Sequence, residues 1–96
     1  QNQDVHLIVG MMKDKDHQGF IKCFKDIVKS ITLIDIPNQE GSISKEELKN
    51  KINGIQKEIN LNNSIKESIQ LINKYQNNIC LVIGSLYLVG EVLNLN

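Results

Sequence analysis

Two short polar segments carry the side chains of this chain that could do chemistry. Residues 14–17, Asp-Lys-Asp-His, offer two carboxylates, an ammonium group and an imidazole in four consecutive positions. Gly84 and Ser85 follow the apolar run 79–83 and precede a helical pattern of apolar residues over 86–93. A strand that passes through a Gly-Ser turn into a helix directs free backbone N–H groups and a hydroxyl at one point. The second segment is therefore suited to a carboxylate or a phosphate.

The apolar pattern predicts the elements that must position these two segments. Strands are expected at 5–12, 31–36, 55–61 and 79–83, the third being the weakest and an edge strand. A helix should follow each strand; the first has Phe20, Phe24, Ile27 and Val28 on its buried face. Capping boxes at 44–47 and 64–67, each Ser-x-x-Glu, begin the second and third helices, and Ile43 with Leu48 forms a hydrophobic staple.

Strands that alternate with helices in this way predict an α/β fold. We expect one domain, residues 1–96, with a Rossmann-like, mostly parallel sheet of about four or five strands flanked by helices. Ligands of such sheets bind beyond the carboxyl ends of the strands. Both polar segments follow a predicted strand, so both are expected at that edge.

The composition excludes several classes of function. Eleven basic and eleven acidic residues give a net charge of zero, which argues against an electrostatic nucleic-acid binder. All eleven cations are Lys, so anion recognition must proceed without a bidentate guanidinium. No apolar run approaches the ~20 residues that a membrane span needs. Cys23 and Cys80 are expected to be reduced core thiols of a cytoplasmic protein, and no Cys/His cluster has metal-ligand spacing.

Three segments together resemble a known family: residues 10–17 (GMMKDKDH), 42–48 (SISKEEL) and 83–92 (IGSLYLVGEV). Their order and character are similar to the C-terminal domain of folylpolyglutamate synthase, including the bacterial form that also acts as dihydrofolate synthase. This family belongs to the Mur ligase superfamily, and the resemblance spans essentially the whole chain. The loop 38–42 departs from the pattern, since relatives often carry an Arg there and this chain has none.

The resemblance implies ATP-dependent amide formation. A folate or dihydropteroate carboxylate would be activated as an acyl phosphate and then attacked by the amine of L-glutamate. ATP and Mg²⁺ would be held mainly by an N-terminal ATPase domain, because this chain contains no P-loop motif. The chain, which opens without Met, is accordingly expected to be a fragment that is inactive alone, acts with its own ATPase domain, and belongs to a monomeric enzyme.

The resemblance also implies roles for four residues, and charge suggests one for a fifth. Asp14 and His17 would lie near the glutamate or the nucleotide, Ser85 would bind the glutamate carboxylate, and Gly84 would let the backbone approach it. From charge alone, Lys15 could neutralise phosphate as a point cation. No catalytic residue and no metal ligand is expected in this domain by itself.

Simpler roles remain open for the same side chains. Asp14 or Asp16 could cap the following helix, His17 could be a solvated residue of its first turn, and Ser85 could be only an N-cap. At the level of function, two alternatives stand beside the folate ligase. One is a Mur-type ligase that adds an amino acid to a cell-wall precursor; the other is a non-enzymatic α/β binding module.

Overall fold

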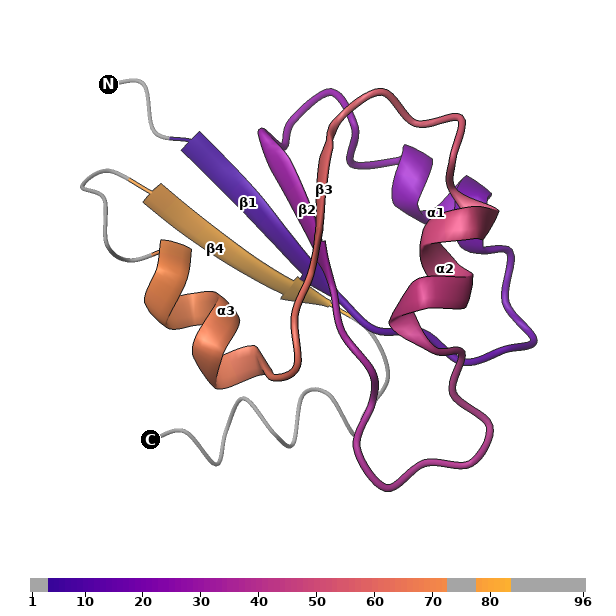
Figure 1. Cartoon of the computed structure of the whole chain (residues 1–96). Helices are drawn as coiled ribbons and strands as arrows, with labels where there is room; N and C mark the ends of the chain where they lie inside the picture. The colour runs from indigo at the N-terminus through magenta and orange to yellow at the C-terminus, as the bar shows by residue number, and fades with distance from the viewer. Residues whose placement is uncertain (1–3, 73–77, 84–96) are drawn as a thin grey trace.

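A computed structural model describes residues 4–72 and 78–83 of the chain. Seven elements follow one another in strict alternation of strand and helix (Figure 1). They are β1 (Asp4–Val9), α1 (His17–Lys22), β2 (Ser30–Leu33), α2 (Lys45–Lys51), β3 (Glu58–Leu61), α3 (Ile65–Ile72) and β4 (Asn78–Ile83).

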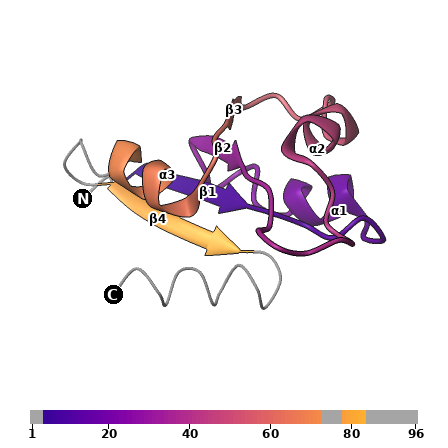
Figure 2. The same cartoon turned by 60° about the horizontal axis from the view of Figure 1, so that its bottom comes forward.

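The four strands form one sheet in the order β3-β2-β1-β4, and all three pairings are parallel. The expected parallel α/β fold is therefore confirmed, and β3 is the edge strand that the sequence predicts. β1 and β2 lie inside the sheet, with β1 between β2 and β4. Figure 2 shows α3 over β1 and β4, while α1 and α2 lie together toward the β2–β3 side.

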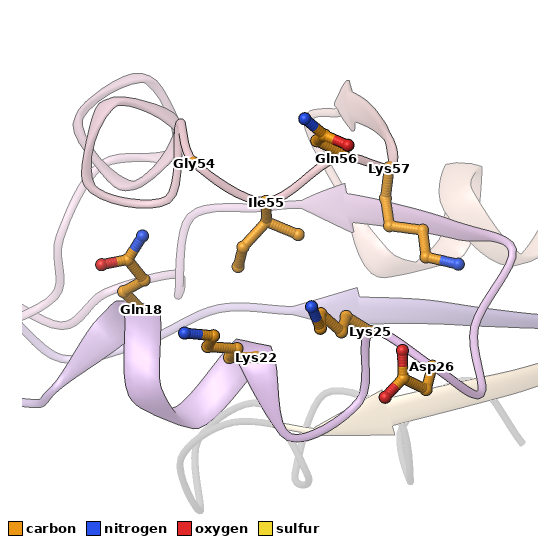
Figure 3. A pocket seen from close by; sticks show the side chains of 8 residues that line it. All are labelled: Gln18, Lys22, Lys25, Asp26, Gly54, Ile55, Gln56 and Lys57. Carbon is orange, nitrogen blue, oxygen red and sulfur yellow. The ribbon is translucent and has the colours of Figure 1, made fainter.

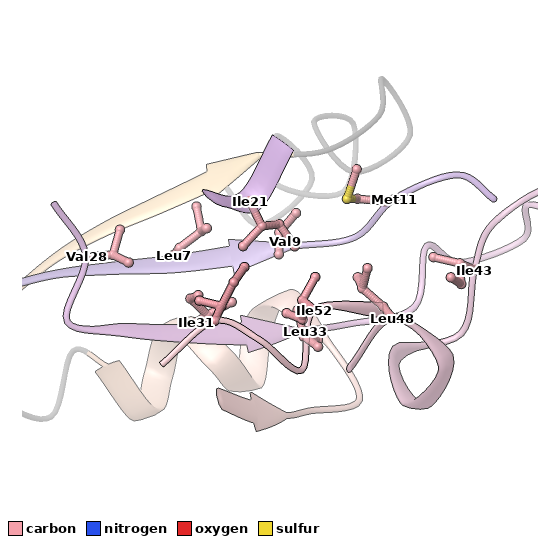
Figure 4. Close-up of a cluster of buried hydrophobic side chains, with 11 residues drawn as sticks. Leu7, Val9, Met11, Ile21, Val28, Ile31, Leu33, Ile43, Leu48 and Ile52 are labelled. Carbon is pink, nitrogen blue, oxygen red and sulfur yellow. The ribbon is translucent and has the colours of Figure 1, made fainter. Parts of the chain in front are cut away.

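Side chains of the sheet divide between two aliphatic cores because successive residues of a strand point to opposite faces. Leu7 and Val9 of β1 belong to the larger core under α1 and α2, whereas Ile8 belongs to the smaller core under α3. Figure 4 shows the larger core, whose buried members are Leu7, Val9, Met11, Ile21, Val28, Ile31, Leu33, Ile43, Leu48, Ile52 and Ile55. The smaller core consists of Ile8, Ile34, Ile65 and Ile72, with Ile69 packed against it.

Both predicted capping boxes begin a helix. The backbone N–H of Glu47 donates to Ser44 Oγ at 3.1 Å, and that of Glu67 donates to Ser64 Oγ at 3.0 Å. Each bond satisfies one of the N–H groups that a helix start leaves without a partner. Ile43 and Leu48 are both buried in the larger core, as the staple requires.

The first helix differs from its prediction. α1 ends at Lys22, and the chain continues to Val28 through turns in which an N–H bonds the carbonyl three residues back, as from Cys23 to Phe20. Because the chain is not α-helical beyond Lys22, Phe24, Ile27 and Val28 do not share one helix face with Phe20. Ile27 is 60% exposed and Phe20 39% exposed, while Val28 is buried as predicted.

Three strands are shorter than their patterns suggest. β1 ends at Val9 and β2 at Leu33, although their apolar runs continue to Met12 and Ile36. β3 begins only at Glu58, because residues 55–57 form turns that close the end of α2. Most of these apolar extensions are buried all the same: Met11, Ile34, Ile36 and Ile55 are buried, and Met12 is half-buried.

The exposure of Cys23 shows that the expectation of two core thiols was wrong for this residue. It is exposed at the C-terminal end of α1, where its Sγ donates to the carbonyl of Gly19 at 3.3 Å. The shortened helix explains the error, because the amphipathic pattern placed Cys23 inside a longer one. The side chain of Cys80 lies outside the described residues. Within the part of the chain that the structure describes, no helix could cross a membrane.

Candidate functional site

The first polar segment follows β1, beyond the carboxyl edge of the sheet. β1 connects to β2 on one side, and the later crossover brings β4 to the other side of β1. Ligands of open α/β sheets bind at such a switch point, since the loops that leave the two strands diverge there. Val9, the last residue of β1, pairs with Ile83, the last residue of β4.

Gly84 and Ser85 follow Ile83 directly in the sequence, but both lie outside the described residues. The structure therefore fixes only where their segment begins, which is beside the start of the loop after β1. Their roles stay predictions.

The loop after β1 is tied to the loop before α2. Met12 and Ser42 form an isolated antiparallel bridge, the N–H of Ile43 donates to Met11 O at 3.0 Å, and that of Lys13 donates to Gly41 O at 2.8 Å. These bonds hold the backbone from Met11 to Lys13 in place. They also bring the polar loop 38–42, where an Arg is expected from relatives, to the same edge of the sheet.

Asp16 is the N-cap of α1. Its carboxylate accepts the backbone N–H of Gly19 at 3.2 Å, so of the two expected capping candidates, Asp14 and Asp16, it is Asp16 that caps the helix. Asp14 and Lys15 are exposed, and neither makes a hydrogen bond or ion pair with any described residue. A carboxylate and an ammonium group thus face solvent at the carboxyl edge and are available to a ligand.

His17 is buried, with only 7% of its surface exposed, so it is not the solvated residue that one reading expected. Its Nε2 lies 2.8 Å from Met12 O. Because a carbonyl oxygen only accepts, Nε2 must carry the hydrogen. The imidazole thereby closes the loop 12–17 on itself, and Nδ1 is the ring atom left for any other contact.

An ion pair that sequence reasoning missed lies at the end of β2. Asp35 Oδ1 accepts the backbone N–H of Lys45 at 2.7 Å, and Asp35 Oδ2 lies 3.1 Å from Lys45 Nζ. This hydrogen bond with Asp35 is the main reason why the pKa of Lys45 is raised above its ordinary value; the nearby Glu46 carboxylate, 3.5 Å away, adds to it. Asp35 lies two residues beyond the end of β2, and the loop between it and Lys45 brings the two side chains together.

A small cavity of about 190 Å³ lies beside this ion pair, at the same edge of the sheet. Asp35 and Pro37 line it from the end of β2, and Asn63, Ser64 and Ile65 line it from the start of α3. It extends the polar surface of the carboxyl edge from the β1 loop toward α3. The described residues contain no group of three or more His, Cys, Asp or Glu side chains that could hold a metal ion.

His6 is a histidine of the sheet interior. It lies in β1, and its Nδ1 is 2.7 Å from the hydroxyl of Ser30 on the neighbouring strand. It stands near the beginning of β1, away from the carboxyl edge, and so belongs to the packing of the sheet.

At the level of sequence, neither a protein-family model nor a curated protein matches the chain. Solved structures do match its fold. A Mycobacterium tuberculosis folylpolyglutamate synthase complexed with ADP and AMPPCP has a TM-score of 0.83 at 11% identity. A Thermotoga maritima folylpolyglutamate synthase has a TM-score of 0.79 at 20% identity, and the bifunctional folylpolyglutamate synthase/dihydrofolate synthase of Yersinia pestis, complexed with AMPPNP and Mn, has 0.77 at 17%.

These matches cover nearly all of this chain but a small part of each neighbour. The covered shares are 99%, 96% and 97% of this chain, against 24%, 21% and 22% of the three enzymes in the order given. The chain therefore has the fold of one domain of these synthases and spans about a quarter or less of their length. This is consistent with a C-terminal domain.

Proposed function

We propose that this chain is the C-terminal domain, residues 1–96, of an ATP-dependent ligase. The enzyme would add L-glutamate to dihydropteroate, to folylpolyglutamate, or to both, through an acyl phosphate. The observation that carries the proposal is the agreement of fold over 96–99% of the chain with folylpolyglutamate synthases. It is supported by the exposed charged loop that follows β1, a strand whose carboxyl end lies beside that of β4 at the switch point of the sheet.

The described residues do not form a complete binding site for ATP or Mg²⁺ by themselves. The sequence has no P-loop, and the described residues contain no candidate metal cluster. Two of the neighbouring synthases were solved with nucleotides, one of them with Mn as well. We therefore assign nucleotide and metal mainly to the N-terminal ATPase domain of the enzyme. The domain formed by this chain would contribute to nucleotide binding and be inactive alone.

In this proposal the domain contributes the glutamate side of the site. Glutamate presents two carboxylates, and its amine must be neutral and oriented to attack an acyl phosphate. Asp14 can accept a hydrogen bond from that amine, while Lys15 can offset phosphate charge because both groups are exposed and unpaired among the described residues. Ser85 and the backbone after Gly84 would bind a glutamate carboxylate.

The proposed role of His17 differs from those of Asp14, Lys15, Gly84 and Ser85. Its Nε2–H is committed to Met12 O, so it can reach glutamate or nucleotide only through Nδ1. Its first effect on ligand binding would be to hold the loop that presents Asp14 and Lys15. The whole enzyme is proposed to be a cytoplasmic monomer.

The proposal is tested by assaying the full-length protein that contains this chain. ATP consumption that requires both glutamate and either dihydropteroate or a folate would support it. Consumption that requires a muropeptide precursor and an amino acid would favour the cell-wall ligase instead. If no acid–amino-acid pair stimulates ATP consumption, the ligase is excluded and the non-enzymatic binding module becomes the better account.

A further inference from the structure

A pocket of about 300 Å³ lies between α3 and the strands β2 and β3. Ser30 and Thr32 line it from β2, Glu58 and Asn60 from β3, and Leu71 from α3. The helix α3 packs against β1 and β4, so the β2–β3 part of the same face lies beside the helix rather than beneath it. The pocket occupies that part of the face, and no described residue of the proposed glutamate site lines it.

The floor of this pocket is polar although it is part of the sheet. Ser30 pairs with Glu58 across the parallel strands, and Thr32 pairs with Asn60. Residues that pair in this way point to the same face, so four polar side chains stand there in two adjacent rows. A polar group that is buried costs free energy unless it is hydrogen-bonded, so the partners of these side chains decide what the pocket can bind.

Thr32 is a buried polar side chain of the floor that has no partner. Only 5% of its surface is exposed, and its hydroxyl makes no hydrogen bond with a described residue. The two buried serines that line the pocket are already committed. Ser30 Oγ lies 2.7 Å from His6 Nδ1, and Ser68 Oγ donates to the carbonyl of residue 64 at 2.8 Å. The Thr32 hydroxyl is therefore the one that a bound molecule can satisfy.

The charge of the lining disfavours an anion. Glu58 is its acidic residue, and no lysine lines the pocket. Glu58 Oε2 accepts an N–H of the Asn60 amide at 3.1 Å, which leaves Glu58 Oε1 and Asn60 Oδ1 as further acceptors. Figure 3 shows a hollow of the opposite character between α1 and the α2–β3 segment, where Lys22, Lys25 and Lys57 are among the lining residues. The pocket beside α3 is thus suited to N–H donors.

Two leucines add an apolar surface to the pocket. Leu61 is the last residue of β3, Leu71 lies near the end of α3, and both are exposed and line the pocket. A ligand with an apolar ring or short chain would remove this surface from water, which is favourable.

We propose that this pocket binds a compact organic cation, an amine or amidine attached to an apolar ring or short chain. Its N–H groups would donate to Glu58 and Asn60, and the Thr32 hydroxyl would supply a further hydrogen bond at the floor. Its apolar part would cover Leu61 and Leu71. The volume is at the lower end of the ~300–1,000 Å³ common for small-molecule pockets, which favours a ligand smaller than a nucleotide.

Three probes that share one ring test the charge preference. Benzamidine is a cation, benzamide is neutral and benzoate is an anion. The chain is titrated with each of them and followed by amide chemical shifts. Benzamidine should give saturable shifts at Thr32, Asn60 and Leu71, benzamide should bind more weakly, and benzoate should produce no saturable shifts at these residues.

Matched variants make the result specific. Glu58→Gln should weaken benzamidine binding by about threefold to fivefold, the range for an exposed ion pair, and leave benzamide binding little changed. Glu47→Gln is the control, because Glu47 is an exposed residue of α2 that does not line the pocket. Thr32→Val removes the unpartnered hydroxyl and should weaken both ligands. Ser68→Ala removes a hydroxyl that is already bonded and should weaken neither.

Three results would overturn the proposal. The first is the absence of saturable shifts with benzamidine, and the second is benzoate binding as tight as that of benzamidine. The third is an equal loss in Glu58→Gln and Glu47→Gln, which would reveal only an effect of net charge. Far-ultraviolet circular dichroism checks folding, and if Thr32→Val does not fold, the two glutamate variants still decide the matter. None of these readouts measures ligation, so the pocket and the proposed ligase function can fail separately.

Discussion

Val9 and Ile83 lie opposite each other in the parallel pairing of β1 and β4. Each is the last residue of its strand, and neighbouring strands are about 4.8 Å apart. Two segments that are far apart in the sequence therefore leave the sheet side by side. The charged loop 14–17 follows Val9, and the Gly-Ser pair follows Ile83, so this one register pair is the structural basis of the proposed glutamate site.

Gly10, which follows β1 directly, should not tolerate a side chain. A Cβ at this position would lie 2.9 Å from Ile36 Cγ1 and 3.1 Å from the backbone oxygen of Ile34, and the oxygen cannot move without shifting the chain. We expect Gly10→Ala to lower the free energy of unfolding by about 1–3 kcal/mol through overpacking. Urea denaturation of the chain measures this.

Gly41 provides the matched control for that substitution. A Cβ there would meet only Met12 Cε, the end of a flexible side chain, at 2.8 Å. Gly41→Ala should therefore cost well under about 1 kcal/mol. Equal losses in the two variants would contradict the close packing described for the start of the β1 loop.

Ser44 should contribute as a helix cap. Its hydroxyl accepts the N–H of Glu47, so Ser44→Ala leaves that donor without a partner and should cost about 1 kcal/mol of unfolding free energy. Ser44→Asp keeps an acceptor at the N-cap and should retain most of the stability. If both variants lose the same amount, the hydroxyl is not acting as a cap.

The ion pair of Asp35 and Lys45 should make stability depend on pH in the alkaline range. The hydrogen bond from the Lys45 ammonium group to Asp35 raises the pKa of Lys45 above 10.5, the value expected in the unfolded chain. A raised pKa in the folded state means that the stabilisation is complete below pH 10.5 and is lost as the pH rises through the higher folded value.

Asp35→Asn isolates this effect, because Asn keeps an oxygen for the Lys45 N–H and removes the charge. The stability difference between the unchanged chain and the variant should be constant below pH ~10 and shrink at higher pH. Urea denaturation series from about pH 9 to about pH 12 measure that difference. A difference that grows across this range would have the wrong sign for the ion pair.

His17 should stabilise the loop through its hydrogen bond to Met12 O. His17→Leu fills the buried position but removes the donor, and should cost about 1–3 kcal/mol. His17→Gln offers an N–H₂ donor and should recover part of that loss. Hydrogen exchange at the amide of Lys13, which donates to Gly41 O, provides a local readout, since a merely apolar role for His17 would leave the two variants equally protected.

Most of the fold could be predicted from the sequence because its signals are local. The two Ser-x-x-Glu boxes mark helix starts by a bond that spans only three residues, and both begin a helix in the structure. The end of α1 could not be predicted in the same way. Phe20 and Ile27 have helical spacing but are exposed, whereas Ile21, which was not on the predicted face, is buried beside Val28.

The candidate site was predictable in position but not in detail. The alternation of strands and helices placed the loop 14–17 at the carboxyl edge, which is where it lies. The role of each side chain in the loop depends on the turn geometry after β1. In that geometry Asp16 caps α1 and His17 bonds Met12 O, while Asp14 and Lys15 face solvent. The contact of Asp35 with Lys45 likewise depends on a loop path that no local pattern encodes.

The most direct test of the central claim is the Michaelis constant for glutamate in the full-length enzyme carrying Asp14→Asn or Ser85→Ala. Each variant should raise this constant by about tenfold, roughly 1.4 kcal/mol of lost binding, while the constant for the folate substrate stays within about twofold. Asn53→Ala, an exposed position beyond the end of α2, should change neither constant. A glutamate constant that is unchanged in both Asp14→Asn and Ser85→Ala would contradict the proposed site.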